Sequence, residues 1–220
     1  MFRNREDAGR QLAERLKDLE LRDPLVLGIP RGGVVTGAAL ARVLGAELDV
    51  VLAHKLRSPV QPELAFGAIG EDGEIYLNHH VEEVTGVTDE YLEQERRRQL
   101  AEIQRRQKLF RPVRPAAAVA GRSVILTDDG IATGSTMLAA IEVVKGRKPH
   151  EVIVAVPVAP ADRLDAIRHR CDRLICLHAP AAFWAVGQFY ESFDPVEDDQ
   201  VVELLRAFAP AAETPNGVTT

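Results

Sequence analysis

Two adjacent carboxylates, Asp128 and Asp129, are the residues whose types and spacing point most directly to chemistry. They follow a short apolar run, Val124–Leu126, that suits a strand buried on both faces. After them comes a loop rich in small and hydroxyl residues, and a helical pattern begins at Met137. The loop includes Gly130, Thr133, Gly134, Ser135 and Thr136. A strand that turns through such a loop into a helix presents unpaired backbone N–H groups at the positive end of the helix dipole, which is a phosphate site.

The two acids restrict which ligand fits beside that loop. Carboxylates next to a phosphate site repel the phosphate unless they bind another part of the same ligand. A sugar 5-phosphate meets this condition, because its ring hydroxyls can donate hydrogen bonds to the acids while the loop takes the phosphate. The alternative is a Rossmann-like turn that carries acids by chance. Neither G-x-G-x-x-G nor G-x-x-x-x-G-K-[ST] occurs in the sequence.

An earlier loop can also approach an anion. The pattern predicts a strand over Pro24–Ile29 and a helix over Val34–Leu44, with Arg31, Gly32 and Gly33 between them. Glycines let the backbone come close to a ligand, and the Arg31 guanidinium suits phosphate oxygens. Strand–helix turns with two glycines are common, so this loop gains weight only beside the acidic pair.

Two cations follow the next predicted strand, Glu47–Ala53. Lys55 and Arg57 alternate with Leu56, so both can project to one side of an extended segment. They are either solvated surface charges or, at a strand end that faces a polyanion, ligands for it.

The alternation of strands and helices predicts an α/β fold with a doubly wound, five-stranded parallel sheet. The predicted core strands are Pro24–Ile29, Glu47–Ala53, Val124–Thr127, Glu151–Val156 and Arg173–Leu177. Ligands bind such sheets at the carboxyl ends of the strands, where all three loops lie. We expect one domain over residues 1–220 that adds four features to this core. They are a hairpin (Leu64–Gly70 with Glu74–Leu77), a helical insertion at about 79–111, a C-terminal hood segment at about 179–193 and a disordered tail at 209–220.

The predicted insertion helix, Thr88–Phe110, is strongly basic. Between Tyr91 and Arg114 eight basic residues stand against three acidic ones. The pattern is typical of a solvated helix face. The alternative is a helix that covers the active site or contacts a polyanionic partner.

Bulk composition limits the possible partners. The 220 residues are 46% hydrophobic and carry a net charge of −6, which predicts a soluble globular domain and argues against nucleic acid as the main partner. The longest apolar stretch, Val152–Ala161, is too short to span a membrane, and the first residues lack a signal-peptide core. Cys171 and Cys176 have apolar neighbours and predict buried thiols rather than a disulfide framework. We therefore expect a cytoplasmic protein without a membrane partner.

The thirteen residues Val124–Thr136 resemble the 5-phosphoribosyl 1-diphosphate (PRPP) binding motif of the type I phosphoribosyltransferases. The resemblance implies a Mg²⁺-dependent transferase of nucleotide metabolism, and we expect a homodimer. Such an enzyme moves the 5-phosphoribosyl group from PRPP to a small nitrogenous acceptor, a nucleobase above all, and releases pyrophosphate. The magnesium ion would be held mainly through the substrate.

The same resemblance assigns roles to individual residues. Asp128 and Asp129 would bind the ribose hydroxyls and count as catalytic together with Lys55 and Arg57. The 5-phosphate would lie on Ala132, Thr133, Gly134, Ser135 and Thr136. Pyrophosphate would lie on Arg31, Gly32, Gly33, Lys55 and Arg57. We expect a cis peptide that is not a proline bond at Arg31–Gly32, and a mobile catalytic loop at about Ser58–Leu64. His79 and His80, adjacent and without further ligands nearby, are interpreted as structural or capping residues.

The acceptor site is predicted in the hood segment. The run F-W-A-V-G-Q-F-Y-E resembles the base-binding segment of the hypoxanthine-guanine phosphoribosyltransferases. It would place Trp184 and Phe183 on the base and Glu191 as a metal ligand. The alternative is a C-terminal core cluster of aromatic residues. Ala132 departs from the 6-oxopurine enzymes, which carry an aspartate at that position, so hypoxanthine or guanine is not favoured.

Two other functions fit the same motif. One is a PRPP- or nucleotide-binding regulator, which could act on RNA through the basic helix. The other is a sugar-phosphate enzyme that shares only the phosphate loop. No residue of the sequence identifies itself as the general base.

Overall fold

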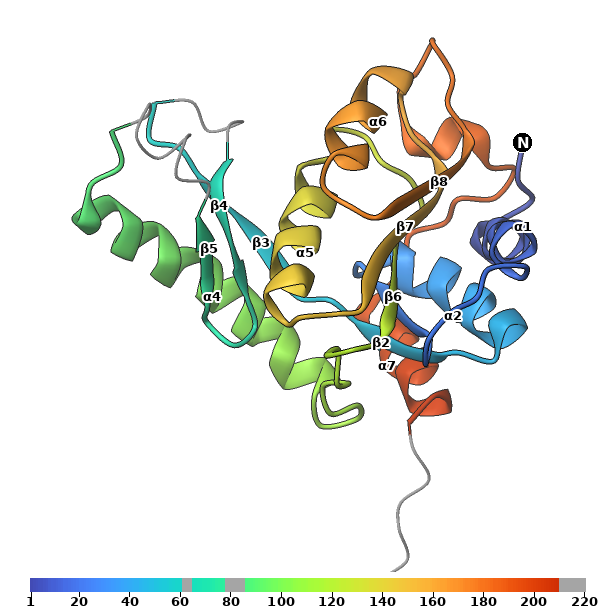
Figure 1. Cartoon of the computed structure of the whole chain (residues 1–220), viewed down its shortest axis with the longest axis horizontal. Helices are drawn as coiled ribbons and strands as arrows, with labels where there is room; N and C mark the ends of the chain where they lie inside the picture. The colour runs from blue at the N-terminus through green and yellow to red at the C-terminus, as the bar shows by residue number, and fades with distance from the viewer. Residues whose placement is uncertain (61–64, 78–85, 210–220) are drawn as a thin grey trace, which may run out of the picture.

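A five-stranded parallel sheet forms the centre of the computed structural model, which describes residues 1–60, 65–77 and 86–209 (Figure 1). Its strand order is β2-β1-β6-β7-β8, all in parallel register. The strands are β1 (Leu25–Gly28), β2 (Glu47–Val50), β6 (Ser123–Thr127), β7 (Glu151–Val158) and β8 (Arg173–His178). The predicted doubly wound α/β fold is therefore confirmed.

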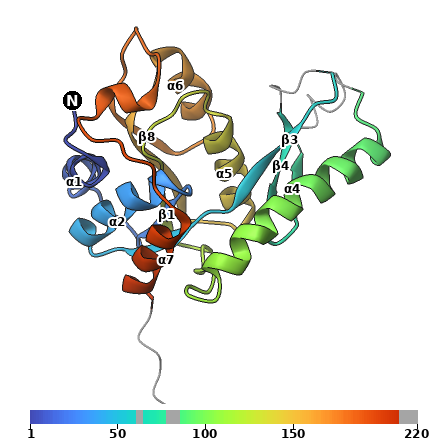
Figure 2. The same ribbon diagram turned by 180° about the vertical axis from the view of Figure 1, so that it is seen from behind.

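Helices cover both faces of this sheet because successive strand residues point to opposite sides. Val26 and Ile125 pack toward α1, α2 and α7, whereas Leu25 and Val124 pack toward α5 and α6 (Figures 1 and 2). The helices on these two faces are α1 (Arg5–Leu16), α2 (Gly32–Leu44), α5 (Ser135–Gly146), α6 (Ala161–Arg168) and α7 (Asp198–Ala207). The continuous apolar runs of the inner strands follow from this double coverage.

The predicted strand Glu47–Ala53 is too long at its C-terminal end, and this changes where the cations lie. The strand β2 ends at Val50, and a separate strand, β3 (Ala53–Arg57), begins a second sheet. The Val51 N–H still bonds to the Gly28 carbonyl at 3.1 Å, and the chain then leaves the main sheet. Unbroken apolar sequence hides this change of sheet. Lys55 and Arg57 thus lie within a strand and not in a loop beyond one.

The second sheet contains the predicted hairpin. Its order is β3-β4-β5, antiparallel throughout, with β4 (Ala65–Gly70) and β5 (Ile75–Leu77) joined around Gly73. The long helix α4 (Asp89–Phe110) runs along this small sheet (Figure 2). The Thr88 side chain caps α4 by accepting the Tyr91 N–H at 3.2 Å. The predicted helix is confirmed from Asp89 onward, while residues 79–85 of the predicted insertion and the tail after Ala209 lie outside the described residues.

Several features of the C-terminal half were not predicted or differ from expectation. The helix α7 was not predicted, although the sequence carries signals for it: the paired acids Asp198 and Asp199 in its first turn and the apolar spacing of Val201 and Leu205. Cys171 and Cys176 are free and half-buried, not fully buried as expected. Within the described parts of the chain, no helix has the length and apolarity needed to cross a membrane.

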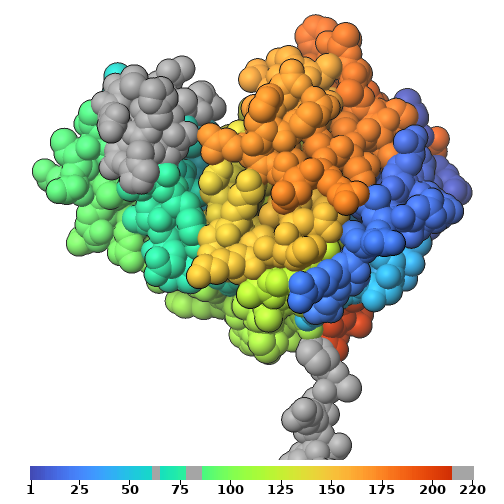
Figure 3. All heavy atoms as spheres, viewed as in Figure 1, coloured from blue at the N-terminus to red at the C-terminus, as the bar shows by residue number. Residues whose placement is uncertain are grey.

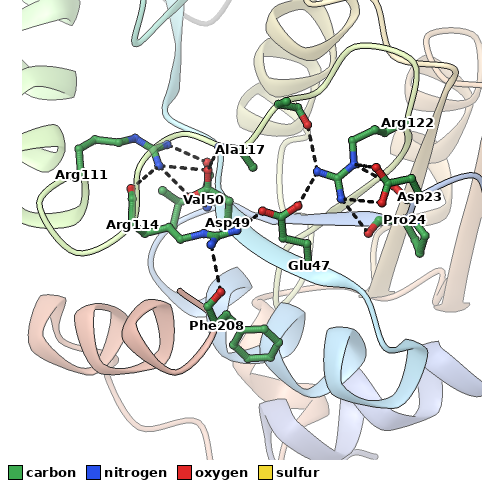
Figure 4. Close-up of polar contacts among 11 residues, drawn as sticks. Asp23, Pro24, Glu47, Asp49, Val50, Arg111, Arg114, Ala117, Arg122 and Phe208 are labelled. Atoms are coloured by element: carbon green, nitrogen blue, oxygen red, sulfur yellow. Dashed lines mark hydrogen bonds and ion pairs between the residues drawn. The ribbon is translucent and has the colours of Figure 1, made fainter. Parts of the chain in front are cut away.

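A buried ion network joins the two sheets at the edge away from the loops (Figure 4). Arg111, which caps the end of α4, pairs with Asp49 of β2 at 2.8 Å and with Glu71 after β4 at 2.6 Å. Asp49 is 2% exposed, and burial raises its pKa while Arg111 opposes that change. Nearby, Arg114 and Arg122 both pair with Glu47.

We predict that Arg111→Ala destabilises the fold strongly, because it leaves two buried carboxylates without their partner. The expected loss is about 3–5 kcal/mol of unfolding free energy in urea titrations. The control is Arg97→Ala, whose side chain is 77% exposed and pairs only with Glu93 in the same helix. The control is expected to lose less than about 0.5 kcal/mol. Equal losses in the two variants would contradict the role assigned to Arg111.

Candidate active site

The acidic pair lies at the carboxyl end of β6, as predicted. Thr127 is fully buried, and Asp128 and Asp129 are half-buried directly after it. The Asp128 Oδ1 atom accepts the Asp129 N–H at 2.9 Å. Burial, and next the neighbouring Asp129 carboxylate, raise the pKa of Asp128 well above its ordinary value. The two carboxyl groups therefore do not ionise with equal ease in the ligand-free chain.

The predicted phosphate loop has the backbone needed for an anion. Gly134 adopts a positive φ of 83° as the N-cap of α5, a conformation that favours glycine. No side chain caps this helix start, and Ala132, Thr133 and Thr136 are exposed around it. The Thr133 and Ser135 hydroxyls lie 3.0 Å apart. Apart from the Ser135 N–H, which donates to the Thr133 hydroxyl at 3.5 Å, the first-turn N–H groups of α5 can bind a ligand or water.

The loop between β1 and α2 packs directly on the acids. A Cβ atom on Gly32 would lie 1.9 Å from Asp129 Oδ2, and one on Gly33 would lie 2.8 Å from the Thr127 carbonyl oxygen. Only glycine permits this approach. The structure thus brings Gly32 and Gly33 together with Asp128 and Asp129, as the two predicted subsites of one ligand require.

The cis peptide of this loop lies one bond earlier than predicted. It is Pro30–Arg31, not Arg31–Gly32. The Arg31–Gly32 bond leads directly into α2, which begins at Gly32, and a regular helical turn is built from trans peptides. Arg31 itself is 40% exposed and pairs with Glu197 at 3.3 Å.

A cavity of about 300 Å³ gathers the cations beside this loop. Lys55 and Arg57 line it from β3, Arg106 from α4, Pro30 from the β1–α2 loop and Thr136 from α5. Arg106 donates to the Pro30 carbonyl at 3.3 Å, and burial lowers its pKa. The buried Nε of Arg57 has no hydrogen-bond partner within the described ranges. Converging guanidinium groups in a cavity form an anion site.

Arg106 was not singled out from the sequence. It was one of eight basic residues between Tyr91 and Arg114, and its neighbours behave as a solvated face. Arg96, Arg97 and Arg105 pair with Glu93 or Glu102 one turn away on the same helix. Only the structure distinguishes the inner face of α4, where Glu95 and Gln99 are 5% and 6% exposed.

This inner face of α4 holds the cation-bearing strand. Glu95 accepts the backbone N–H of Arg57 at 3.2 Å and the Gln99 amide at 2.8 Å. Gln99 in turn contacts the His54 ring at 3.0 Å, and the Tyr91 hydroxyl donates to the Arg57 carbonyl at 2.9 Å. The insertion helix therefore positions β3 as well as contributing Arg106. Of the predicted mobile loop, residues 61–64 lie outside the described residues.

The hood segment, residues 179–193, lies next to the N-terminal residues (Figure 3) and contacts the acidic loop. Its short 3-10 helix η1 (Val186–Phe189) is so close to Gly130 that a Cβ there would lie 2.5 Å from Val186. The Tyr190 hydroxyl donates to the Asp129 carbonyl at 2.5 Å. Phe2 packs in a cluster with Tyr190. The acidic loop is thus enclosed by the hood.

The aromatic residues of the hood divide into two groups. Phe189, Tyr190 and Phe193 belong to the packed cluster, so the core alternative holds for them. Trp184 is 89% exposed, and Phe183 stacks on Phe189 at 5.4 Å between ring centroids. Glu191 is exposed, with its N–H on the Phe2 carbonyl. Across the described residues, no group of three or more His, Cys, Asp or Glu could hold a metal ion.

A second residue that was not predicted contacts the acids directly. Arg5, at the start of α1, donates from Nε to Asp129 Oδ2 at 2.7 Å. The sequence alone does not reveal this contact, because it joins residues 124 positions apart.

The phosphoribosyl transferase domain model matches residues 3–193 of this chain. The chain belongs to that family. Two relatives from Mycobacterium tuberculosis strains, MT0597 and Rv0571c, bear the provisional name phosphoribosyl transferase and are 45% identical over 93% of this chain. This chain spans 46% of the length of these two relatives. The crystal structure of TT1426 from Thermus thermophilus matches with a TM-score of 0.91 and 44% identity, over 95% of this chain and 99% of that one.

The raised pKa of Asp128 leads to a stability prediction. Ionising this carboxyl in the folded chain costs free energy; the cost is absent below about pH 3.9, the ordinary Asp value, and grows as pH rises through the folded pKa. We therefore expect Asp128→Asn, which still offers an oxygen to the Asp129 N–H, to need more urea for unfolding than the parent at about pH 7, with the gap closing toward about pH 3.

The control for this experiment is Asp165→Asn, whose side chain is 77% exposed and which should change stability by less than about 0.5 kcal/mol at either pH. A gap at low pH as large as the gap at neutral pH would show that ionisation is not the cause.

Proposed function

We propose that this chain binds PRPP with Mg²⁺ and transfers its 5-phosphoribosyl group to a nitrogen acceptor, with release of pyrophosphate. The observation that carries the proposal is the contact of the Gly32 backbone with the Asp129 carboxylate. This contact supports a pyrophosphate loop and a sugar-hydroxyl site within reach of one ligand, and the start of α5 nearby supports a site for the 5-phosphate. Membership of the phosphoribosyl transferase domain family supports the same ligand.

Each part of PRPP has a counterpart in the site. The ribose hydroxyls donate to Asp128 and Asp129, and the 5-phosphate accepts N–H groups of residues 132–136. The pyrophosphate lies along Gly32 and Gly33 toward the cavity lined by Lys55, Arg57 and Arg106. Arg31, at the mouth of this loop, adds a fourth cation.

The chemistry demands little beyond placement and charge. As the C1–pyrophosphate bond breaks, negative charge grows on the leaving group and positive charge on the ribose ring. Fixed cations aimed at the leaving group lower that barrier most where water is excluded. The acids hold the sugar so that its anomeric carbon faces the acceptor.

Magnesium fits this donor set as an ion carried by the substrate. Mg²⁺ prefers oxygen ligands and keeps several waters, so it binds through phosphates with one or two carboxylates. Asp128 and Asp129 are the carboxylates nearest the ribose, and the ion would neutralise charge on the diphosphate. We also propose Glu191, which is exposed in the hood segment, as a ligand of this magnesium ion.

The acceptor is proposed to stack on Trp184, beside Phe183. An exposed indole two residues before Val186, which touches the PRPP loop, is well placed to meet a flat nitrogen heterocycle. Ala132 leaves no acid to read a purine at that position.

The proposal is tested by incubating the chain with PRPP, Mg²⁺ and a panel of nucleobases and small amines, and by measuring pyrophosphate. We expect release that depends on both Mg²⁺ and one class of acceptor. Tight PRPP binding without release for any acceptor would favour the regulatory alternative. Absence of PRPP binding in calorimetry would overturn the proposal.

Arg106→Ala is predicted to weaken pyrophosphate binding by about 10-fold or more, because it removes one charge-assisted contact from the cavity. The matched control is Arg105→Ala, the adjacent residue, whose guanidinium pairs with Glu102 and Asp198. It should change affinity less than about 2-fold. Calorimetry with magnesium pyrophosphate decides between them. Similar losses for both variants would mean that general positive charge, and not the cavity, binds the anion.

A further inference from the structure

Arg5 reaches the sugar-binding acid from a helix that the proposed reaction does not otherwise use. Its Nε lies 2.7 Å from Asp129 Oδ2, and the two side chains are only 11% and 15% exposed. An ion pair shielded from water to this degree is stronger than a surface pair, and removing one partner costs far more. The contact is therefore built into the site.

The remaining surface of the Arg5 guanidinium is also used. Its Nη1 donates to the Asp194 carbonyl at 2.8 Å, and its Cζ atom lies 3.8 Å from the centroid of the Phe193 ring. These contacts fix the direction in which Nε points. The guanidinium is thus held by the hood while it bonds to the acid.

The backbone that carries Arg5 is equally fixed. Asn4 caps α1 by accepting the Asp7 N–H at 2.9 Å, which sets where the helix begins. Gly9, four residues after Arg5, lets α1 lie very close to α2. A Cβ atom on Gly9 would lie 2.3 Å from the Thr36 carbonyl oxygen. Arg5 therefore enters the site from a rigid element, as positioning groups do.

Gly32 completes the junction. A Cβ at this position would collide with Asp129 Oδ2 and lie 2.9 Å from Arg5 Nε. The start of α1, the start of α2 and the end of β6 thus meet at one carboxylate. Three elements that converge on one oxygen specify its position closely.

We propose that Arg5 is a positioning residue for PRPP, one that orients the Asp129 carboxylate as the acceptor for a ribose hydroxyl. This inference rests on the proposed function. Because Arg5 Nε holds the Asp129 Oδ2 atom at 2.7 Å, the whole carboxylate is fixed in one direction before the sugar arrives.

The groups that face Asp129 are few and come from three elements. They are Arg5 from α1, Asp128 beside it on the β6 loop and Tyr190 from the hood, whose hydroxyl contacts the Asp129 backbone. Arg5 is the only cation among these three. Replacing it with a neutral side chain should therefore release the Asp129 carboxylate from its fixed orientation.

The competing account makes Arg5 a structural link between α1 and the hood. That role predicts lower stability and an equal loss of affinity for every ligand. A positioning role predicts loss for ligands that carry the ribose and none for pyrophosphate alone, whose cations lie on β3 and α4.

The binding test compares Arg5→Gln with Arg5→Lys and with Arg10→Gln. Arg10 is on the same helix, is 52% exposed and pairs only with Glu6. With PRPP and Mg²⁺ in calorimetry we expect about 10-fold or greater weakening for Arg5→Gln, a smaller loss for Arg5→Lys, and less than about 2-fold for Arg10→Gln. Magnesium pyrophosphate should bind all variants alike. PRPP affinity within 2-fold of the parent in Arg5→Gln, or a parallel loss for pyrophosphate, overturns the inference.

A crystal structure without ligand separates this inference from the proposed function. In Arg5→Gln the Asp129 carboxylate should leave the orientation that it has in the parent, because its 2.7 Å contact with Arg5 Nε is lost. If the parent fails to bind PRPP, the proposed function falls while this structure still decides whether Arg5 orients Asp129. An unchanged carboxylate orientation refutes that role. Arg5→Lys, which retains a cation, carries the binding comparison if Arg5→Gln does not fold.

Discussion

The site depends on the close approach of two glycine residues, Gly32 and Gly33, to a pair of carboxylates. The Gly32–Gly33 turn lies so near Asp128 and Asp129 that either Cβ atom would overlap with the acidic loop. Parallel neighbours β1 and β6 bring these two turns to the same edge, with Gly28 paired to Thr127. Adjacency in the sheet thus creates the site, and glycine allows it to close to ligand size.

Charge is separated across this turn. The acids, with Arg5 as counter-ion, lie on one side, and Lys55, Arg57 and Arg106 lie in the cavity on the other. A ligand that bridges the turn must therefore be a hydroxyl donor at one end and an anion at the other. Many sugar phosphates and nucleotides carry both kinds of group, but the proposed ligand PRPP has its ring hydroxyls next to its diphosphate, which is the order that this turn requires. The arrangement selects a ligand by the order of its groups as well as by total charge.

The sequence predicted what is local and missed what depends on distant contacts. Val124–Thr136 carries its strand, acids, loop and helix start within thirteen residues, so periodicity and turn chemistry were sufficient. The change of sheet at Val51 was missed because an apolar run reads the same in either sheet. Arg5 and Arg106 were missed because each acquires its role from a partner far away in the chain, Asp129 and Pro30 respectively. The cis bond, which the family resemblance implied, was predicted at Arg31–Gly32, one bond after its position at Pro30–Arg31. The composition of the loop does not identify which of its bonds is cis.

The buried network at the opposite edge connects stability to function. Arg111 binds Asp49 on the main sheet and Glu71 on the small sheet, and it caps the helix that carries Arg106. One guanidinium therefore joins the main sheet, whose strand β6 carries the acids, to the small sheet and to the helix that carry the cations. Since a buried pair of this kind loses much of its energy when its geometry changes, the small sheet cannot move relative to the main one at low cost. The network thus helps to fix the distance between the acids after β6 and the cations on β3 and α4, which is the separation that the proposed substrate would bridge.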